Sequence, residues 1–266
     1  MMRSLKGQRV LITGASGGLG QALAWVLAEQ GAHVALAARR LERLQELQEA
    51  LQRSGYKAVA ISLDVTDADA VTYGLHRTVE ALGGLDILVN NAGLAYFGSV
   101  STMAPQQMAR LVATNIYGAL YTSQAAVPYL ETSRGMIVNI SSPLAKRAFP
   151  YVSFYAGTKS FLNAVSDGMR LELKARGIHV LTYMAPETAT DLAQHTLHAP
   201  GVTLPPIRRR LADPRHVALQ ISRAIRHERR EVMASRFFVA LGLMMPGLVD
   251  WLLYHAMVRR YRHENF

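Results

Sequence analysis

Residues 10–20 read VLITGASGGLG and join a short apolar strand, a glycine-rich turn and the start of a helix. Glycines let the backbone of such a turn approach a pyrophosphate, and the helix N-terminus presents free N–H groups with a partial positive charge. The glycine spacing is G-x-x-x-G-x-G and not G-x-G-x-x-G. A tight strand-to-helix turn without a ligand is the alternative interpretation. A dinucleotide held by this turn would contact Gly14, Ser16, Gly17, Gly18, Leu19 and Gly20.

Short apolar runs alternate with longer helical patterns along most of the chain. This alternation predicts an α/β fold, with a doubly wound parallel sheet of the Rossmann type and helices on both faces in three layers. Ligands bind at the carboxyl edge of such a sheet. The predicted strands are Val10–Thr13, His33–Ala37, Ala58–Leu63, Ile87–Asn90, Met136–Ile140 and Ile178–Tyr183. The predicted helices are Gly20–Gln30, Leu41–Arg53, Asp67–Leu82, Gln106–Leu130 and Tyr155–Arg176.

The regular alternation stops after the sixth strand. Residues 187–212 are rich in proline and predict a mobile loop near the substrate. A further helix is expected to begin at Pro214 and to run to about Arg230, followed by a last strand over Glu231–Ala234. We therefore expect a catalytic domain over residues 1–235 and a hydrophobic helical extension over residues 236–266.

Composition sets the broad class of the protein. Of 266 residues, 50% are hydrophobic and 18% are charged, which excludes a disordered chain. The absence of cysteine excludes disulfides, thiolate metal ligands and a cysteine nucleophile. A formal net charge of +10 attracts phosphorylated cofactors, anionic lipid or nucleic acid. The N-terminus runs straight into the first strand, so we expect no cleaved signal peptide and a cytoplasmic protein.

Two other classes of site are disfavoured. The arginines at 208–210 and 223–230 are not interleaved with aromatic residues, so we expect no nucleic acid partner. His195 and His198 have no third ligand nearby in the sequence, so we expect no metal site.

The end of the second strand indicates which dinucleotide binds. Arg39 and Arg40 stand where a residue meets the adenosine ribose, and an arginine there favours a 2′-phosphate and hence NADP. Solvated charges at a helix start are the alternative. Asp64, which with Val65 follows the third strand, is a candidate for an adenine contact or for a turn or N-cap aspartate.

A candidate reacting centre follows the fifth strand. Ser142 lies at the carboxyl edge of the sheet, and Tyr155 and Lys159 are one helical turn apart, so their side chains share a helix face. A nearby ammonium stabilises a phenolate, which brings a tyrosine towards general acid/base use. An isolated Tyr-x-x-x-Lys pair is common on amphipathic helices, so the prediction depends on all three residues together.

These motifs resemble those of the short-chain dehydrogenase/reductase family, in the same order, over residues 8 to about 186. The resemblance implies an NADP-dependent oxidoreductase that interconverts an alcohol and a carbonyl compound. It implies that Tyr155 is the acid/base, that Lys159 also holds the nicotinamide ribose, and that Asn115 holds a water that links Lys159 to solvent. It assigns cofactor contacts to Asn91, Ala92, Gly93, Pro186, Thr188 and Thr190 as well.

The sequence departs from the family pattern after the sixth strand. Where the family has Pro-Gly, this chain has Pro186-Glu187, which restricts the backbone and adds a negative charge near the expected nicotinamide carboxamide. A cofactor-binding sensor protein without efficient chemistry is therefore a second hypothesis.

Apolar and aromatic residues follow the strands that carry the reacting centre. They predict a hydrophobic alcohol, ketone or aldehyde as the substrate, and packing of the loops is the alternative role. The residues are Leu94, Tyr96, Pro143, Leu144, Phe149 and Tyr151.

Residues 237–258 are strongly apolar and are flanked by arginines at 236, 259, 260 and 262. Pro246-Gly247 divides the segment, and Asp250 would lie near the middle of a bilayer, so a membrane span is disfavoured. Three roles stay open: a cover for the substrate pocket, an oligomer contact, or peripheral membrane contact through residues 237–262. The family resemblance further implies a homodimer or homotetramer.

Overall fold

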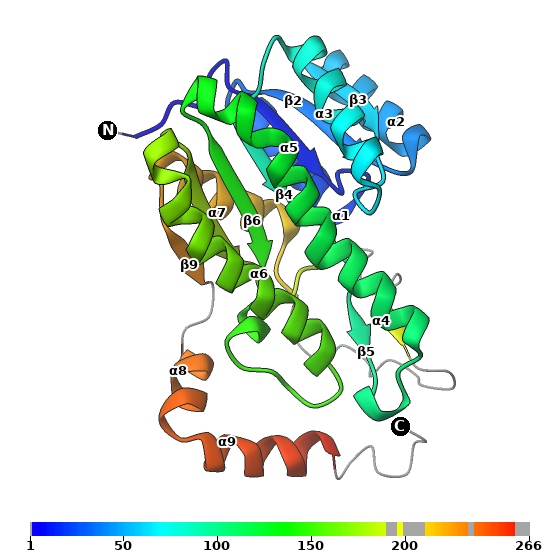
Figure 1. The fold of residues 1–266 in the computed structure, drawn as a ribbon, viewed down its shortest axis with the longest axis vertical. Coiled ribbons are helices and arrows are strands. Elements are labelled where there is room, and N and C mark those ends of the chain that lie inside the picture. The colour runs from blue at the N-terminus through cyan, green and yellow to red at the C-terminus, as the bar shows by residue number, and fades with distance from the viewer. Residues whose placement is uncertain (1, 190–195, 199–210, 234–236, 259–266) are drawn as a thin grey trace.

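A parallel sheet forms the centre of the protein in the computed structural model, which describes residues 2–189, 196–198, 211–233 and 237–258. Within these residues the sheet has seven strands in the order β3-β2-β1-β4-β6-β7-β9 (Figure 1). This order places the carboxyl ends of β1 and β4 side by side at a topological switch point. The strands are β1 (Arg9–Thr13), β2 (His33–Ala38), β3 (Ala58–Ser62), β4 (Ile87–Asn90), β6 (Met136–Ser141), β7 (His179–Met184) and β9 (Glu231–Met233).

Helices cover both faces of the sheet, which confirms the predicted α/β/α layers of the Rossmann fold. The helices α1 (Gly18–Glu29), α2 (Leu41–Arg53) and α7 (Pro214–Arg226) cover one face. The helices α3 (Ala68–Leu82), α5 (Gly118–Ser133) and α6 (Ser153–Glu172) cover the other. A shorter helix, α4 (Pro105–Val112), precedes α5.

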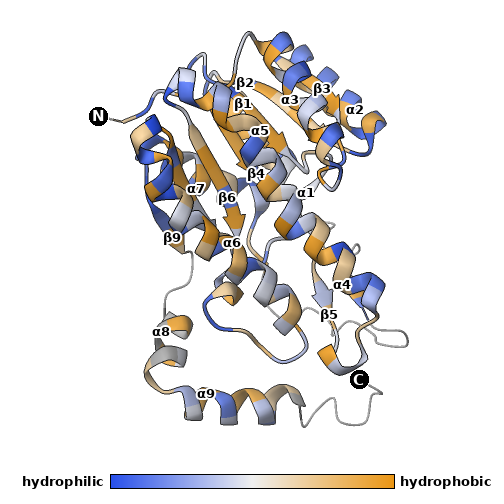
Figure 2. Ribbon diagram, viewed as in Figure 1, coloured by the Kyte–Doolittle hydropathy of each residue, from blue (hydrophilic) through white to orange (hydrophobic). Residues whose placement is uncertain are grey.

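The strands are apolar because both of their faces are buried. Along β1, Val10 and Ile12 face the core beneath α1 and α7, whereas Leu11 faces the core beneath α3 and α5. All three side chains have no exposed surface. Figure 2 shows the same pattern, with hydrophobic central strands and helices that alternate between hydrophobic and hydrophilic residues. The helices packed on both faces of the sheet therefore fix the position and direction of each strand end.

The predicted helix over Gln106–Leu130 is present and continues in right-handed helical backbone from α4 into α5. The structure has α4, a π-helical segment over Ala113–Tyr117 and then α5. A π-helical segment adds a residue to the helical turn and is frequent at functional sites. Here it carries Asn115, whose side chain is 1% exposed and bonds to the backbone of Leu94. The contact of this side chain therefore coincides with a π-helical turn inside the predicted helix.

The described part of the predicted extension forms α8 (Phe237–Met244), α9 (Pro246–Leu253) and a π-helical segment over Tyr254–Val258. In Figure 1 these helices lie beyond the carboxyl end of the sheet, at the end of the molecule that also carries β5 (Tyr96–Phe97). β5 pairs with β8 (Leu197–His198). Among the described residues, no helix is long and apolar enough to cross a bilayer.

A buried polar network holds β4 against β6. Asn90 donates from Nδ2 to Asn139 Oδ1 at 2.9 Å and to Ser123 Oγ at 2.9 Å. Its Oδ1 accepts from Thr122 Oγ1 at 2.6 Å, and Asn139 Nδ2 donates to Ser166 Oγ at 2.8 Å. All five side chains are buried. The chain of bonds runs from α5 through both strands to α6, which carries Tyr155 and Lys159.

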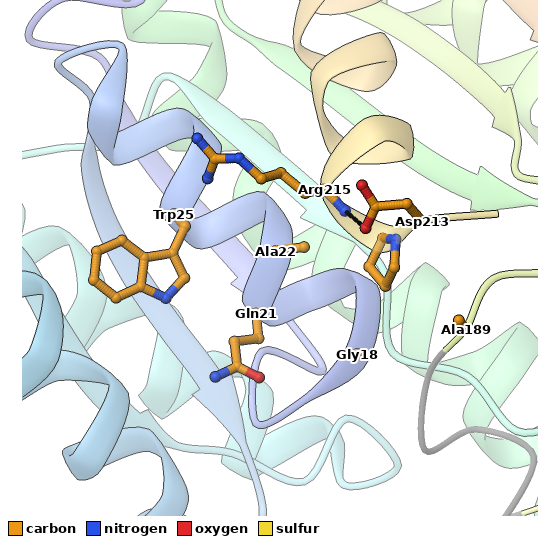
Figure 3. A pocket seen from close by; sticks show the side chains of 8 residues that line it. Gly18, Gln21, Ala22, Trp25, Ala189, Asp213 and Arg215 are labelled. Atoms are coloured by element: carbon orange, nitrogen blue, oxygen red, sulfur yellow. Dashed lines mark hydrogen bonds between the residues drawn. The ribbon is translucent and has the colours of Figure 1, made fainter.

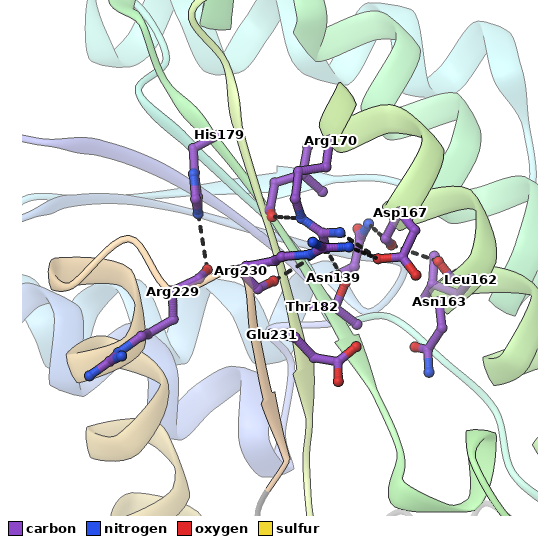
Figure 4. Close-up of polar contacts among 12 residues, drawn as sticks. Asn139, Leu162, Asn163, Asp167, Arg170, His179, Thr182, Arg229, Arg230 and Glu231 are labelled. Atoms are coloured by element: carbon purple, nitrogen blue, oxygen red, sulfur yellow. Dashed lines mark hydrogen bonds and ion pairs between the residues drawn. The ribbon is translucent and has the colours of Figure 1, made fainter. Parts of the chain in front are cut away.

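Arg170 on α6 hydrogen-bonds to β7 and to the residue before β9 (Figure 4). Its Nε donates to Val180 O at 3.0 Å, and its Nη2 donates to Thr182 Oγ1 and to Arg230 O, both at 3.2 Å. Asp167 forms an ion pair with the same guanidinium. One side chain therefore ties the carboxyl half of α6 to β7 and to the residue before β9.

Replacing Asn90 by leucine should lower the free energy of unfolding by about 2–4 kcal/mol, because its buried partners would lose their hydrogen bonds. Equilibrium unfolding in urea measures the change. Gln45→Leu, an exposed amide on α2, is the matched control and should stay within about 0.5 kcal/mol of the parent protein. Equal stability of the two variants would contradict a stabilising role for the network.

Candidate active site

The glycine turn after β1 is held against the end of β4. Asn91 Nδ2 donates to Thr13 O at 2.9 Å and to Gly14 O at 3.3 Å. A Cβ at Gly14 would lie 2.9 Å from Ala92 Cα, and Gly14 has φ +67°. A Cβ at Gly20 would lie 2.3 Å from Gly14 O. The backbone here packs on itself too closely for side chains. The resulting glycine cradle lies directly before α1, where the free N–H groups of a helix N-terminus suit a pyrophosphate.

The N-terminus of α1 is available to an anionic ligand. Gly17 caps α1 without a side-chain hydrogen bond. A groove of about 400 Å³ lies between the first turns of α1 and the start of α7 (Figure 3). Arg215 lines this groove, and its guanidinium donates to both carboxylate oxygens of Glu29 at 2.9 and 2.8 Å. The groove is lined by Gly18, Gln21, Ala22, Trp25, Ala189, Asp213, Pro214 and Arg215.

The two arginines after β2 differ in their contacts. Arg40 donates from Nη2 to Ser16 Oγ at 3.1 Å, so its guanidinium lies over the glycine turn. Arg39 is exposed beside it. Both lie at the strand end where the sequence predicts the adenosine ribose. The arrangement offers two positive charges to a phosphate group at this position.

Asp64 lies in a turn after β3. Its Oδ1 accepts hydrogen bonds from Thr66 N at 2.9 Å and from Thr66 Oγ1 at 2.8 Å. Val65 is 8% exposed and lies under α5, where a Cβ at Gly118 would be 2.7 Å from Val65 Cγ2. The carboxylate therefore shapes the turn with one oxygen, and its adenine contact stays a prediction.

Ser142, Tyr155 and Lys159 come together at the carboxyl end of β6. Ser142 follows β6 and is 7% exposed, and its hydroxyl lies beside the Tyr155 phenol and accepts from Leu144 N at 3.2 Å. Tyr155 is half-buried in the first turn of α6. Lys159 is 6% exposed, and its Nζ donates to Ile140 O at 2.9 Å. The hydroxyl and phenol can therefore meet one substrate oxygen, with the ammonium one turn deeper.

Burial shifts the pKa values of both titratable groups. Loss of solvation raises the pKa of Tyr155 to about 12, where the Ser142 hydrogen bond opposes the shift and the negative charge of Glu187 adds to it. Loss of solvation lowers the pKa of Lys159 to about 8. At pH 7 the phenol therefore carries its proton and can donate it, and a positive charge lies within the same helical turn.

Asn115 links the π-helical segment to the reacting centre. Its Oδ1 accepts from Leu94 N at 2.8 Å, and its Nδ2 donates to Leu94 O at 2.9 Å and to Thr158 Oγ1 at 3.0 Å. A Cβ at Gly93 would lie 3.3 Å from Asn115 Oδ1 and 3.4 Å from Lys159 Nζ. Asn115 therefore joins the segment after β4 to α6, and the water predicted for it stays a prediction.

The segment after β7 contains the departure from the family pattern. Thr188 Oγ1 donates to Pro186 O at 2.8 Å. Glu187 accepts at its carbonyl from Ala212 N at 3.0 Å, and its side chain is exposed. Thr190 and His195 lie outside the described residues, and among the described residues no cluster of metal-binding side chains is present.

The predicted substrate residues fall into two groups. Tyr96 is 1% exposed and belongs to an apolar cluster with Met103 and Leu111, against which Leu94 and Tyr155 pack. The other four lie on the loop between β6 and α6 and are half-buried. They are Pro143, Leu144, Phe149 and Tyr151.

The sequence analysis missed three further residues of this apolar cluster. Met108, Phe154 and Leu197 pack against it beside Tyr155. Met108 lies on α4 and Phe154 on α6, and the spacing of apolar residues along each helix could have indicated that they face inward. No local signal marks Leu197, because it reaches the cluster only through the pairing of β8 with β5.

Comparison with known proteins identifies the class. The short chain dehydrogenase family profile matches residues 8–200. A glycine betaine reductase of Emericella nidulans is 37% identical over 86% of this chain, which spans 18% of that protein. An uncharacterized oxidoreductase of Staphylococcus saprophyticus is 34% identical over 73% of this chain and 79% of its own length. A short chain dehydrogenase from Burkholderia cenocepacia, solved in complex with NADP, has a TM-score of 0.75 and 33% identity over 86% of this chain and 94% of its own.

The chain belongs to the short chain dehydrogenase family. It is an oxidoreductase of that family, whose members bind NAD or NADP. The expected family resemblance is thereby confirmed.

Lys159→Met should raise the melting temperature at pH 7 by several degrees, because a buried ammonium costs on the order of 1–3 kcal/mol. The pKa of Lys159 is about 8 in the folded protein and 10.5 ordinarily. Between these pH values the unfolded chain binds more protons, so stability rises with pH, and the advantage of the variant should shrink. Thermal melts from pH 6.5 to about 10 measure both effects.

Lys57→Met, at an exposed lysine, is the control and should leave the melting temperature and its pH dependence unchanged. A Lys159→Met variant that melts below the parent protein at every pH would show that the ammonium stabilises the fold.

Proposed function

We propose that this protein is an NADP(H)-dependent oxidoreductase that interconverts a hydrophobic secondary alcohol and a ketone, or an aldehyde. The observation that carries the proposal is that Ser142, Tyr155 and Lys159 lie together at the carboxyl end of β6, on the sheet edge that also carries the glycine cradle. The N-terminus of α1 that follows this cradle suits the pyrophosphate of a bound dinucleotide. The bound nicotinamide would supply the hydride for reduction or accept it in oxidation.

The residues of the chain divide the acid/base work. In the reductive direction, Ser142 donates a hydrogen bond to the carbonyl oxygen, and Tyr155 transfers its proton to that oxygen as the carbon gains hydride. The Lys159 ammonium stabilises the phenolate that remains. In oxidation the phenolate takes the hydroxyl proton. The product balance is one hydride to carbon and one proton to oxygen, so the chemistry needs no metal.

The preference for NADP is supported by charge at the end of β2. Arg39 and Arg40 lie where the ribose is predicted, and the Burkholderia relative was solved with NADP. Asp64 and Val65 would lie near the adenine, and the segment from Pro186 to Thr190 near the nicotinamide.

Substrate class and assembly belong to the same proposal. The apolar residues around Tyr155 favour a hydrophobic substrate. We further propose a cytoplasmic homodimer or homotetramer. A cofactor-binding sensor without efficient chemistry is the second candidate, and the observation that favours it is the Glu187 charge near Tyr155.

Tyr155→Phe should lower turnover by about 10²–10⁴-fold in a panel of hydrophobic ketones and aldehydes, because it removes only the general acid. NADPH oxidation measures turnover, and fluorescence titration should show NADPH affinity within about twofold of the parent protein. Tyr73→Phe, an exposed tyrosine on α3, is the matched control and should be fully active. A parent protein that binds NADPH but reduces no member of the panel would favour the sensor hypothesis.

Replacing Arg39 and Arg40 together by alanine should weaken NADPH binding about tenfold to a hundredfold, because charge-assisted hydrogen bonds to a 2′-phosphate are lost. Binding of NADH should change little, since that cofactor has no 2′-phosphate. Arg53→Ala, at the exposed end of α2, controls for the loss of positive charge. An equal loss for both cofactors would contradict NADP recognition at this position.

A further inference from the structure

Apolar side chains are exposed on one segment of the protein. Six of the twelve large apolar side chains that are exposed in the described residues lie within residues 244–254. Exposed patches of this kind mark contacts with a partner, whereas apolar residues scattered singly do not. The six are Met244, Met245, Leu248, Trp251, Leu252 and Tyr254, with exposed fractions between 44% and 81%.

The helix α9 has two apolar faces with different surroundings. Leu248, Trp251 and Leu252 share one face, because they are spaced by three and four residues, and all three are exposed. Val249 and Leu253 share another face, where Val249 is fully buried and Leu253 is half-buried. One face therefore packs on the protein and the other stays open.

The attachment of α8 and α9 places these helices against a loop at the carboxyl end of the sheet. Arg147, on the loop between β6 and α6, forms an ion pair with Asp250. The same arginine side chain would lie 3.2 Å from a Cβ at Gly242 of α8. This loop also carries Phe149 and Tyr151, two of the predicted substrate residues. Figure 1 shows α8 and α9 at the carboxyl end of the sheet, where the site lies.

Charge and residue chemistry decide which partner fits. Trp251 and Tyr254 combine an apolar ring with a polar tip, which suits the interface between lipid and water. The chain carries a net charge of +10, and the sequence after this segment contains Arg259, Arg260 and Arg262. Positive charge next to this segment in the sequence attracts anionic lipid.

Asp250 does not oppose lipid contact in this arrangement. Its carboxylate is paired with Arg147. Asp250 is two positions from both Leu248 and Leu252, so it lies away from the helix face that they share and need not enter the hydrocarbon. The eight residues of α9 are also too few to cross a bilayer. A helix with these properties lies parallel to the membrane surface.

We propose that Leu248, Trp251 and Leu252 of α9 insert into the surface of an anionic lipid bilayer and turn the active-site end of the protein towards it. A hydrophobic substrate dissolved in the bilayer would then lie next to the loop between β6 and α6. This last step rests on the proposed function, but surface binding itself does not depend on any reaction.

The first test is sedimentation of the full-length protein with vesicles at about 0.1 M salt. We expect binding to vesicles of phosphatidylglycerol and phosphatidylcholine, and at least about tenfold weaker binding to phosphatidylcholine alone. The double variant Trp251→Ser, Leu252→Ser should lose at least about tenfold in binding. The matched control, Tyr73→Ser with Leu171→Ser, removes two exposed apolar side chains elsewhere and should bind as the parent does.

The second test reports on the proposed contact directly. The chain has two tryptophans, Trp25 and Trp251, so Trp25→Phe isolates the fluorescence of Trp251. Its emission should shift to shorter wavelength when anionic vesicles are added, because the indole leaves water. Circular dichroism of each variant confirms the fold separately from lipid binding.

Two outcomes would overturn the proposal. The first is a parent protein that stays in the supernatant with anionic vesicles and shows no shift in Trp251 emission. The second is equal loss of binding in the α9 variant and the control. If the parent protein is an oligomer that does not bind vesicles and the α9 variant is a monomer, the exposed face of α9 is a contact between copies of the chain, and the lipid proposal is wrong.

Discussion

Two consecutive amides at the end of β4 hold the site together. Asn90 reaches across to Asn139 on β6 and to α5, whereas Asn91 reaches to the backbone at Thr13 and Gly14 after β1. The glycine cradle lies on one side of β4 and the reacting centre on the other. The distance between a cofactor held in that cradle and Tyr155, the proposed acid/base, would therefore depend on one strand end. Hydrogen bonds fix this strand end from both sides, buried at Asn90 and partly buried at Asn91.

Burial of Tyr155 and Lys159 costs free energy, and the same burial sets the pKa values that the proposed acid/base chemistry would use. Burial keeps the Tyr155 phenol protonated and reduces the tendency of Lys159 to stay charged. A negative charge that develops on Tyr155 during proton transfer would restore a partner to the ammonium. The fold holds these groups in place through the packing of α6 and through Asn115, which bonds to Leu94 and Thr158. Titratable groups that are buried at a cost in free energy are typical of sites that are organised before the substrate arrives.

The sequence predicts strongly patterned elements well and long-range contacts poorly. Six strands and the helix Leu41–Arg53 agree closely with the structure, because apolar runs bounded by turns leave few alternatives. The π-helical turn at Asn115 could not be foreseen, since it lies inside a regular helical pattern and carries a bond to Leu94 twenty-one positions away. The burial of Tyr96 likewise depends on packing against Met103 and Leu111. The convergence of Ser142, Tyr155 and Lys159 follows from helical spacing and strand direction, both of which are local.

The short outer strand has a consequence for how copies of this chain associate. Only three residues of β9 pair with β7, which has six residues, and Arg170 already uses the carbonyl of Arg230 next to it. An edge this short offers few unpaired amides as a template for another chain. Pairing of a strand from another molecule at the β9 edge of the sheet is therefore disfavoured.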